Sequence, residues 1–418
     1  MNLKIRLSIM NFLGFAAWGA YLTCMGAYLA EAGFGSIIGW FYSVQGIVSI
    51  FMPGIMGIVA DRWIQAQKLL SLCHLTAGAF ICAAGVYGSM EGCSMGMLFT
   101  LYAISVAFYM PTIALSNSVA FNALTKAGMD TIKAFPPIRV FGTIGFICTM
   151  IAVDVCGLQT SSMQFVVSGV ISIFLALYCL TLPAVPTKNA SHDDGRPAGL
   201  VQALGLDAFK LFRQKDMAIF FIFSMFLGVS LQVTNGYANP YITSFQSIAE
   251  YADTFGAQHA NILISISQIS ETCCILLIPF FLKRFGIKKV VMIAMAAWVL
   301  RFGLFGLGNP GSGVWMFILS CIVYGVAFDF FNISGALFVD QNTDTGIRSS
   351  AQGLFMIMTN GLGATIGTLG AQVIVNNLVF NEGITDTLAG WRESWYIFAA
   401  YSLVVLVLFA IIFRPKEK

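Results

Sequence analysis

The feature of this sequence that most restricts its fold is a succession of long apolar runs. A helix that crosses a bilayer needs about 20 mostly apolar residues. About twelve runs of this kind follow one another along the chain, and only 10% of its 418 residues are charged, against about 25% in soluble domains. The runs lie near residues 6–30, 36–60, 68–88, 95–121, 135–157, 162–183, 217–246, 258–282, 290–308, 313–338, 349–377 and 395–413. The sequence therefore predicts an all-α integral membrane protein with twelve transmembrane helices.

The first run resembles a signal peptide, because Lys4 and Arg6 precede an apolar stretch. It is too long for one, however, and it contains no clear small-residue cleavage site before Gly35. We interpret it as the first transmembrane span.

Basic residues mark one side of the membrane. They gather in alternate loops, whereas the other loops are mostly acidic, with Arg392 as the exception. The basic loops hold Arg62 and Lys68; Lys126 and Lys133; Lys188, Arg196, Lys210, Arg213 and Lys215; Lys283, Arg284, Lys288 and Lys289; Arg348; and Arg414, Lys416 and Lys418. Loops rich in lysine and arginine face the cytoplasm, so both termini are predicted to be cytoplasmic. The net charge of +3 reflects this asymmetry and does not indicate nucleic-acid binding.

The chain carries traces of a duplication. The tripeptide VAF occurs at 106–108 and 326–328, and TIG occurs at 143–145 and 365–367, at offsets of 220 and 222 residues. One long polar segment, PTKNASHDDGRPAG at 186–199, lies between the copies, and LVQALGLDAFKLFRQK at 200–215 has helical periodicity. We predict two six-helix halves, 1–183 and 217–418, joined by a cytoplasmic linker at 184–216 with an amphipathic helix.

Two similar six-helix halves on a cytoplasmic linker are typical of the major facilitator fold. In that architecture substrate binds near the middle of the bilayer, between halves that rock around it. The loop GIVADRW at 57–63 resembles the signature that follows the second span, although the basic cluster expected after it is reduced to Lys68.

Two acids, Glu271 and Asp329, lie deep in predicted spans, while Arg139 stands near the cytoplasmic start of the fifth span and Arg301 lies in the ninth. A charge near the centre of a bilayer costs about 2.5–3.5 kcal/mol on insertion scales, so such residues usually face a cavity, pair with one another and mark function. Arg301 could serve a structural pairing instead, and we place it outside the predicted site. The ten cysteines show no metal-ligand spacing, and we predict neither a metal nor a cofactor.

Helical spacing predicts that polar and aromatic side chains share faces near mid-depth. Residues three, four or seven apart lie on one side of a helix. The resulting stripes are Arg139, Thr143 and Phe146 in the fifth span, Gln232 and Asn235 in the seventh, Gln268 and Glu271 in the eighth, and Tyr324 with Phe328 and the adjacent Asp329 in the tenth. Amides and carboxylates suit hydroxyl and amide groups, and aromatic faces suit a flat ring.

Some of these residues also have purely structural explanations. Gln232, Asn235 and Gln268 could hydrogen-bond between helices, Phe146 and Phe328 could be packing residues, and Arg139 could extend to the inner interface. Gly236 and Pro240 in NGYANP predict a kink or unwound stretch in the seventh span, either as a moving gate or as a static bend.

Several long motifs resemble the bacterial nucleoside permeases of the nucleoside:proton symporter family. They are MNLKIRLSIMNFLGFAAWG at the start of the chain, FPPIRVFGTIGF, GLDAFKLF, IFFIFSMFLGVSLQVTN, ISQISET and YGVAFDFFNISG. The resemblance implies a proton-coupled transporter that imports purine and pyrimidine nucleosides across the inner membrane. It places the substrate site on Arg139, Thr143, Phe146, Gln232, Asn235, Gln268, Glu271, Tyr324, Phe328 and Asp329. GVS at 228–230 and GYANPY at 236–241 depart from relatives and could alter base selectivity.

The charges suggest how a proton is coupled. Arg139 contributes one positive charge, and ionised Glu271 and Asp329 contribute two negative ones, so a single proton makes the set neutral and easier to close away from water. We expect symport of about one proton per nucleoside on this ground. Asp329 is the preferred proton carrier and Glu271 the alternative. No phosphate-cradling G-x-x-x-x-G-K-[ST] motif occurs, so no ATP is implied.

Other functions stay open at this point. A sugar:proton symporter of the same fold and a non-transporting nucleoside sensor are the alternatives. An enzyme is not expected, because the three histidines form no evident metal triad or nucleophile–base arrangement. The expected partners are nucleoside, proton and lipid, and the protein is expected to be a monomer. The sequence does not choose between purine and pyrimidine preference.

Overall fold

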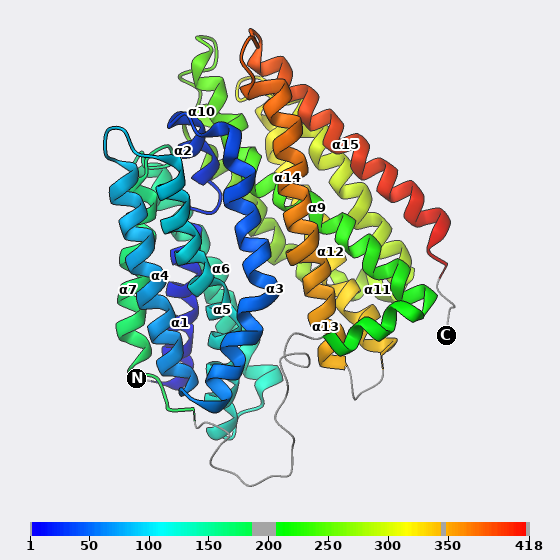
Figure 1. Ribbon diagram of the computed structural model, residues 1–418. Coiled ribbons are helices and arrows are strands. Elements are labelled where there is room, and N and C mark those ends of the chain that lie inside the picture. Colours follow the sequence, from blue (N-terminus) through cyan, green and yellow to red (C-terminus); the bar gives the residue numbers. More distant parts are fainter. Residues whose placement is uncertain (1, 186–205, 344–347, 415–418) are drawn as a thin grey trace. The chain divides into compact units, whose positions relative to one another are not determined.

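All regular elements in the described part of the chain are helices (Figure 1). The structure is a computed structural model that describes residues 2–185, 206–343 and 348–414. The chain divides into two compact units, one comprising Met1–Met25 and Ile47–Leu204, the other Gly26–Gly46 and Gly205–Lys418. Residues 26–46 thus belong with the second unit, although they precede most of the first in sequence.

The first unit is a bundle of long helices. Its elements are α1 (Leu3–Gly19), the later part of α3 (Ile38–Arg62), α4 (Ala66–Gly88), α5 (Met95–Lys126), α6 (Thr131–Val155) and α7 (Met163–Cys179). α1 packs against α6 and α7, and α4 packs against α5 and α7. Apolar side chains such as Leu7, Leu70 and Leu124 are fully buried between them. The hydroxyl of Ser94 caps α5 by accepting a hydrogen bond from the Met97 amide.

The second unit is built around α9, α11 and α12. Its elements are α2 (Met25–Glu31), η1 (Gly35–Ile37), the start of α3, η3 (Leu206–Arg213), α9 (Lys215–Ser244), η4 (Phe245–Ser247), α10 (Phe255–Gln258), α11 (Ala260–Leu307), α12 (Val314–Gln341), α13 (Arg348–Met356), η6 (Ile357–Gly363), α14 (Ala364–Val375), η7 (Asn376–Phe380) and α15 (Thr387–Ile412). α11 packs against α12 and α15, and α9 packs against η6 and α14.

The predicted apolar runs all lie on helices. Nine helices of the described part are long and apolar enough to cross a membrane, and α7 is a shorter apolar helix. The first run forms α1 and α2, and the eighth and ninth runs form the two arms of α11, which meet at Gly286. Gly286 has a φ of 75°, a conformation that glycine adopts without steric cost. The all-helical membrane fold is therefore confirmed, and the count of twelve crossings stays a prediction.

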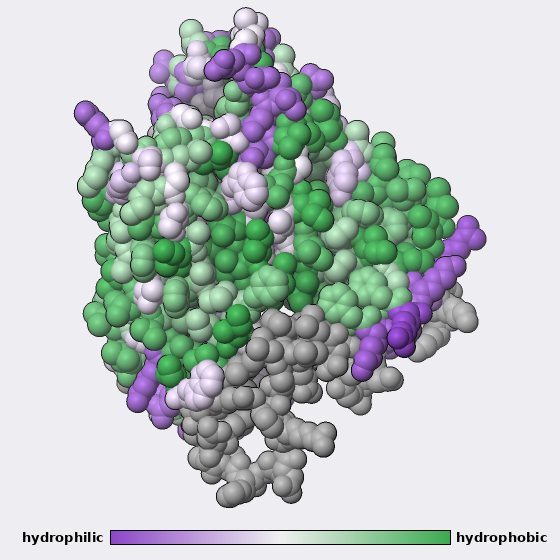
Figure 2. All heavy atoms as spheres, viewed as in Figure 1, coloured by the Kyte–Doolittle hydropathy of each residue, from purple (hydrophilic) through white to green (hydrophobic). Residues whose placement is uncertain are grey.

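Large apolar side chains remain exposed along the helices. Figure 2 shows hydrophobic residues over the sides of the helices and hydrophilic residues gathered towards their ends. On α15, Val404 is 56% exposed and Ile411 is 57% exposed, while Trp395 on the same helix is fully buried. Such a surface is stable only against hydrocarbon or another apolar partner. The protein is a multi-pass membrane protein.

The repeated TIG motif has the same packing role in each unit. Gly145 on α6 lies against the Phe12 carbonyl of α1, and Gly367 on α14 lies against the backbone of Val229 on α9. A Cβ atom on Gly367 would come within 2.6 Å of the Val229 Cα, closer than side chains tolerate. The duplication thus reproduces a glycine-mediated backbone contact between the first long helix of each unit and a later one.

Of the kink or unwound stretch predicted in the seventh span, the unwound stretch is wrong, and the kink stays a prediction. α9 stays helical through Gly236 and Pro240. Proline has no amide hydrogen to donate to the carbonyl four residues earlier, which here is that of Gly236. The Gly236 carbonyl and the Pro240 ring lie very close to Gly26 of α2. A side chain at position 26 would collide with both. Gly236 and Pro240 therefore make room for α2 against a continuous helix.

The structure describes only part of two other segments about which the sequence makes a prediction. The amphipathic helix predicted at 200–215 appears as the 3₁₀ helix η3, and residues 186–205 of the linker lie outside the described residues. The side chains of Asp61 and Arg62 in GIVADRW also lie outside them.

Candidate functional site

On the first unit, the predicted site residues share one side of α6. Arg139 and Thr143 are half-buried and Phe146 is buried. The guanidinium carbon of Arg139 lies over the ring of Phe15 on α1, 3.9 Å from its centroid. This distance is within the range of a cation–π contact. Arg139 is therefore held against an aromatic face and does not extend freely towards the membrane interface.

α1 contributes a second aromatic side chain beside this stripe. The ring of Trp18 meets Phe146 edge-on, with 6.2 Å between centroids and an interplanar angle of 89°. Its indole Nε1 is buried and has no hydrogen-bond partner among the described residues. Sequence reasoning missed Phe15 and Trp18, although their spacing of three residues puts them on one helix face. In a run that is apolar throughout, this spacing alone is a weak signal.

On the second unit, α9 presents two amides. Asn235 Nδ2 donates to Gln232 Oε1 at 3.2 Å, as their spacing of three residues allows. Both side chains are half-buried. Two nearby residues at which the sequence departs from its relatives contact other segments and not these amides. Gly228 packs on Thr359, and Ser230 lies 3.4 Å from the Ser402 hydroxyl of α15.

α12 presents two stacked rings next to a buried acid. The rings of Tyr324 and Phe328 lie 5.6 Å apart with planes only 7° from parallel. Asp329 follows Phe328 directly and is 4% exposed. Its Oδ2 has no hydrogen-bond partner within the described ranges. A buried carboxylate oxygen without a hydrogen-bond donor is energetically costly.

The first arm of α11 brings a second acid to the same place. Gln268 and Glu271 are half-buried, and both are close enough to Tyr324 to interact with it. Glu271 is also an acidic neighbour of Asp329. Five of the predicted residues, Gln268, Glu271, Tyr324, Phe328 and Asp329, therefore cluster between α11 and α12.

Arg301, which sequence reasoning left outside the site, touches this cluster. Its guanidinium carbon lies 4.7 Å from the centroid of the Tyr324 ring. Trp298, one turn earlier on the second arm of α11, meets the same ring edge-on at 5.9 Å. Tyr324 is thus enclosed by aromatic and cationic groups.

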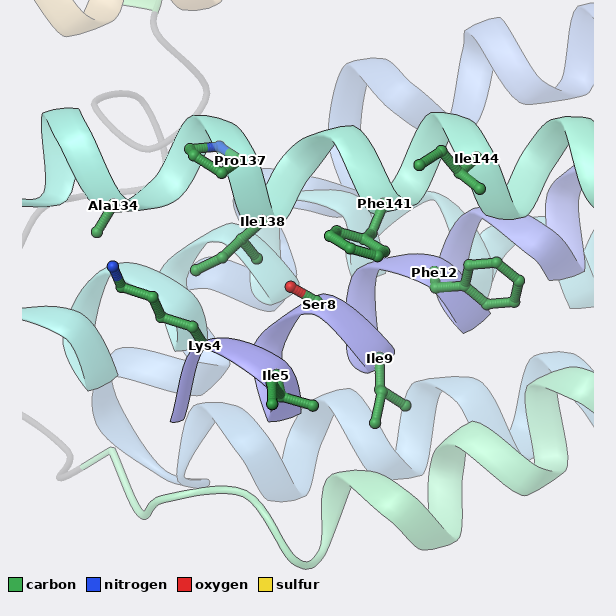
Figure 3. A pocket seen from close by; sticks show the side chains of 10 residues that line it. All are labelled: Lys4, Ile5, Ser8, Ile9, Phe12, Ala134, Pro137, Ile138, Phe141 and Ile144. Atoms are coloured by element: carbon green, nitrogen blue, oxygen red, sulfur yellow. The ribbon is translucent and has the colours of Figure 1, made fainter. Parts of the chain in front are cut away.

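A separate cavity of about 520 Å³ lies between α1 and α6 (Figure 3). Its walls are mostly apolar, and Lys4 and Ser8 supply its polar atoms; the lining residues are Lys4, Ile5, Ser8, Ile9, Phe12, Ala134, Pro137, Ile138, Phe141 and Ile144. None of the predicted site residues lines it. A side chain two positions from Arg139, such as Phe141, lies about 200° around the helix. The cavity chemistry suits hydrocarbon and not a polar ligand.

The described residues hold no group of three or more His, Cys, Asp or Glu side chains that could bind a metal. The cluster on α11 and α12 instead offers two stacked rings, the amide of Gln268 and two acids. This set can bind a small ligand that combines a flat ring with hydroxyl groups.

The family model for nucleoside H⁺ symporters matches residues 1–418. The chain belongs to the nucleoside:proton symporter family. It is 45% identical to nucleoside permease NupG of Escherichia coli over 420 residues, covering 100% of this chain and 97% of that protein. It is 44% identical to xanthosine permease of Escherichia coli over 412 residues, covering 98% and 95%. These relatives are transporters, and the family is one of transporters and not of enzymes.

Solved structures agree with this assignment to the symporter family. The crystal structure of the nucleoside transporter NupG matches with a TM-score of 0.90, covering 100% of both chains at 44% identity. The D-xylose-proton symporter matches with a TM-score of 0.70 at 13% identity, covering 99% of this chain and 97% of that one. The second match shows the fold alone, and the predicted major facilitator architecture is confirmed.

Proposed function

We propose that this symporter imports nucleosides together with protons across the bacterial inner membrane by alternating access. The observation that carries the proposal is the cluster of two carboxylates and two stacked rings on α11 and α12, in a chain that matches the symporter family throughout. The relatives named above are a nucleoside permease and a xanthosine permease. Both purine and pyrimidine nucleosides are expected substrates.

Each part of the site has a distinct task in this proposal. Gln268 and Glu271 bind the ribose hydroxyls, because an amide and a carboxylate on one helix face can accept from and donate to a diol. Tyr324 and Phe328 contact the base, since stacked rings offer a flat apolar surface. Gln232 and Asn235 read the polar edge of the base. Arg139, Thr143 and Phe146 are the contribution of the first unit.

Asp329 is proposed to carry the proton. Its buried position makes the ionised form costly unless a cation balances it. In this scheme Arg139 supplies the balancing positive charge, so that one proton makes the set of Arg139, Glu271 and Asp329 neutral. Glu271 is the alternative carrier, but the ribose hydroxyls already give it a task. The stoichiometry expected is about one proton per nucleoside.

The proposed orientation places both termini and the 184–216 linker in the cytoplasm, with two six-helix halves on either side of that linker. The support is the alternation of basic and acidic loops. We propose a monomer as the transporting form.

Uptake by proteoliposomes tests this function. Purified protein should accumulate radiolabelled uridine and adenosine unchanged when the outside is acidified. Unlabelled nucleosides should compete, whereas free ribose should not. Competition by ribose alone would indicate a sugar symporter, and binding without uptake would indicate a sensor.

A further inference from the structure

Arg301 is a cation buried completely within the membrane domain. Its side chain is 0% exposed, and among the described residues it forms no ion pair. Its Nε and Nη2 have no hydrogen-bond partner within the same ranges. An unpaired buried charge is expensive, so the groups around it must compensate for that cost.

The guanidinium ties both arms of α11 to α12. Nη1 donates to the Ser320 carbonyl at 2.7 Å and lies 3.5 Å from the Ser267 hydroxyl, one residue before Gln268. The Ser320 hydroxyl in turn donates to the Arg301 carbonyl at 2.9 Å. The side chain therefore fixes the register of three helical segments that also carry proposed site residues.

Two aromatic faces lie beside the guanidinium, and the Cys321 side chain also interacts with it. The guanidinium carbon lies 4.7 Å from the Tyr324 ring centroid and 5.4 Å from that of Phe305. Tyr324 also has the acidic residues Glu271 and Asp329 as neighbours. One tyrosine ring thus stands among a fixed cation and the two acids of the site. Arginine suits this place better than lysine, because its planar, weakly hydrated head stacks on rings.

We propose that Arg301 is a positioning residue for nucleoside binding, which acts by holding the Tyr324 ring in place. This inference rests on the proposed function, because it assigns Tyr324 to the nucleoside site. Arg301 itself does not contact the substrate in this scheme. Its effect on affinity should therefore depend on whether a ring is present at position 324.

A double-mutant cycle on purified protein tests this dependence. Uridine and adenosine affinities are measured by calorimetry for Arg301→Met in the wild-type, Tyr324→Phe and Tyr324→Leu backgrounds. A desolvated cation–π contact is worth up to about 2 kcal/mol, so we expect about ten- to thirtyfold weaker binding where a ring is present. In the Tyr324→Leu background the loss should shrink to about twofold or less.

Two further variants separate positioning from general packing. Arg301→Lys keeps the cation and should recover a large part of the affinity. Ser320→Ala removes the hydroxyl that donates to the Arg301 carbonyl but leaves the carbonyl that receives Nη1, so its loss of affinity should be much smaller than that of Arg301→Met. If Arg301→Met does not give monodisperse protein, Arg301→Lys is carried through the same three backgrounds, with a smaller loss expected. If Tyr324→Leu binds too weakly for calorimetry, half-saturation in counterflow at millimolar nucleoside supplies the comparison.

An equal loss in all three backgrounds, or no loss in any, would overturn the role of Arg301. A wild-type protein that binds neither nucleoside would overturn the proposed function instead.

Discussion

The guanidinium of Arg139 on α6 rests on the ring of Phe15 on α1, 3.9 Å from its centroid. This contact gives Arg139 a fixed position before any ligand arrives. Phe15 therefore contributes to the proposed site by holding Arg139 in position, although its side chain is neither polar nor charged.

Phe15→Leu should weaken uridine binding by about three- to tenfold, because the cation–π contact that orients Arg139 is lost while the apolar volume is largely kept. Calorimetry on purified protein measures the change. Phe12→Leu is the matched control, since Phe12 lies on the same helix and lines the apolar cavity instead. Equal losses in both variants would show that packing of α1, and not the arginine contact, sets the affinity.

Glu271→Gln should bind uridine and adenosine roughly ten- to hundredfold more weakly, because hydrogen bonds to a charged group are worth about 1.5–3 kcal/mol. Expression should hardly change. Cys273→Ser, two residues away and exposed, is the control that should leave affinity unaltered. Unchanged binding by Glu271→Gln would remove this acid from direct contact with the nucleoside.

Asp329→Asn should separate exchange from proton-driven accumulation. The amide resembles the protonated acid, so substrate still binds and counterflow at zero gradient continues. Acidifying the outside of proteoliposomes should no longer stimulate uptake of radiolabelled uridine. Asp340→Asn alters an acid near the end of the same helix and should retain the stimulation. Full acid-driven accumulation by Asp329→Asn would indicate that Glu271, and not Asp329, carries the proton.

Impermeant thiol labelling in intact cells should distinguish the two sides of the membrane. In a cysteine-free background, a cysteine at Ala127, between α5 and α6, should stay unlabelled because its loop carries Lys126 and Lys133. A cysteine at Glu91, between α4 and α5, should be labelled. Both positions are exposed. The reverse pattern would invert the proposed orientation.

Gly367→Ala should lower the melting temperature, with a cost of about 1–3 kcal/mol, because the new methyl group would strike the backbone of Val229. Gly370→Ala on the same helix meets no atom within 4 Å and should be neutral or slightly stabilising. Thermal unfolding in detergent measures both. A similar melting temperature for the two variants would mean that α14 can shift away from α9 at little cost.

Much of the fold could be predicted from the sequence, because a bilayer restricts spanning segments in a family of this kind to long apolar helices. The sequence did not show where a helix tolerates proline. Gly236 and Pro240 predicted a kink or an unwound stretch, yet α9 stays helical there, and the Gly236 carbonyl lies close to Gly26 of α2. That outcome depends on a segment some 200 residues away in the chain.

The site residues were predictable where a charged side chain stands in an otherwise apolar run. Glu271 and Asp329 stand out in apolar runs, and stripes at helical spacing accompany them. Phe15 and Trp18 did not stand out, because aromatic residues in an apolar span look like ordinary packing. Arg301 was noticed, but its contact with Tyr324 depends on how α12 packs against the second arm of α11, which spacing along one helix does not reveal.

The glycine contacts of the TIG motif restrict how this transporter can move. Where two backbones touch without a side chain between them, neither helix can slide past the other without a collision. α1 with α6, and α9 with α14, should therefore travel as rigid pairs during a transport cycle. A change of access then has to come from movement outside these pairs, and we expect Gly286, where the chain leaves the helical conformation, to be one place that bends. Residues that do not contact the nucleoside would then set the rate of transport.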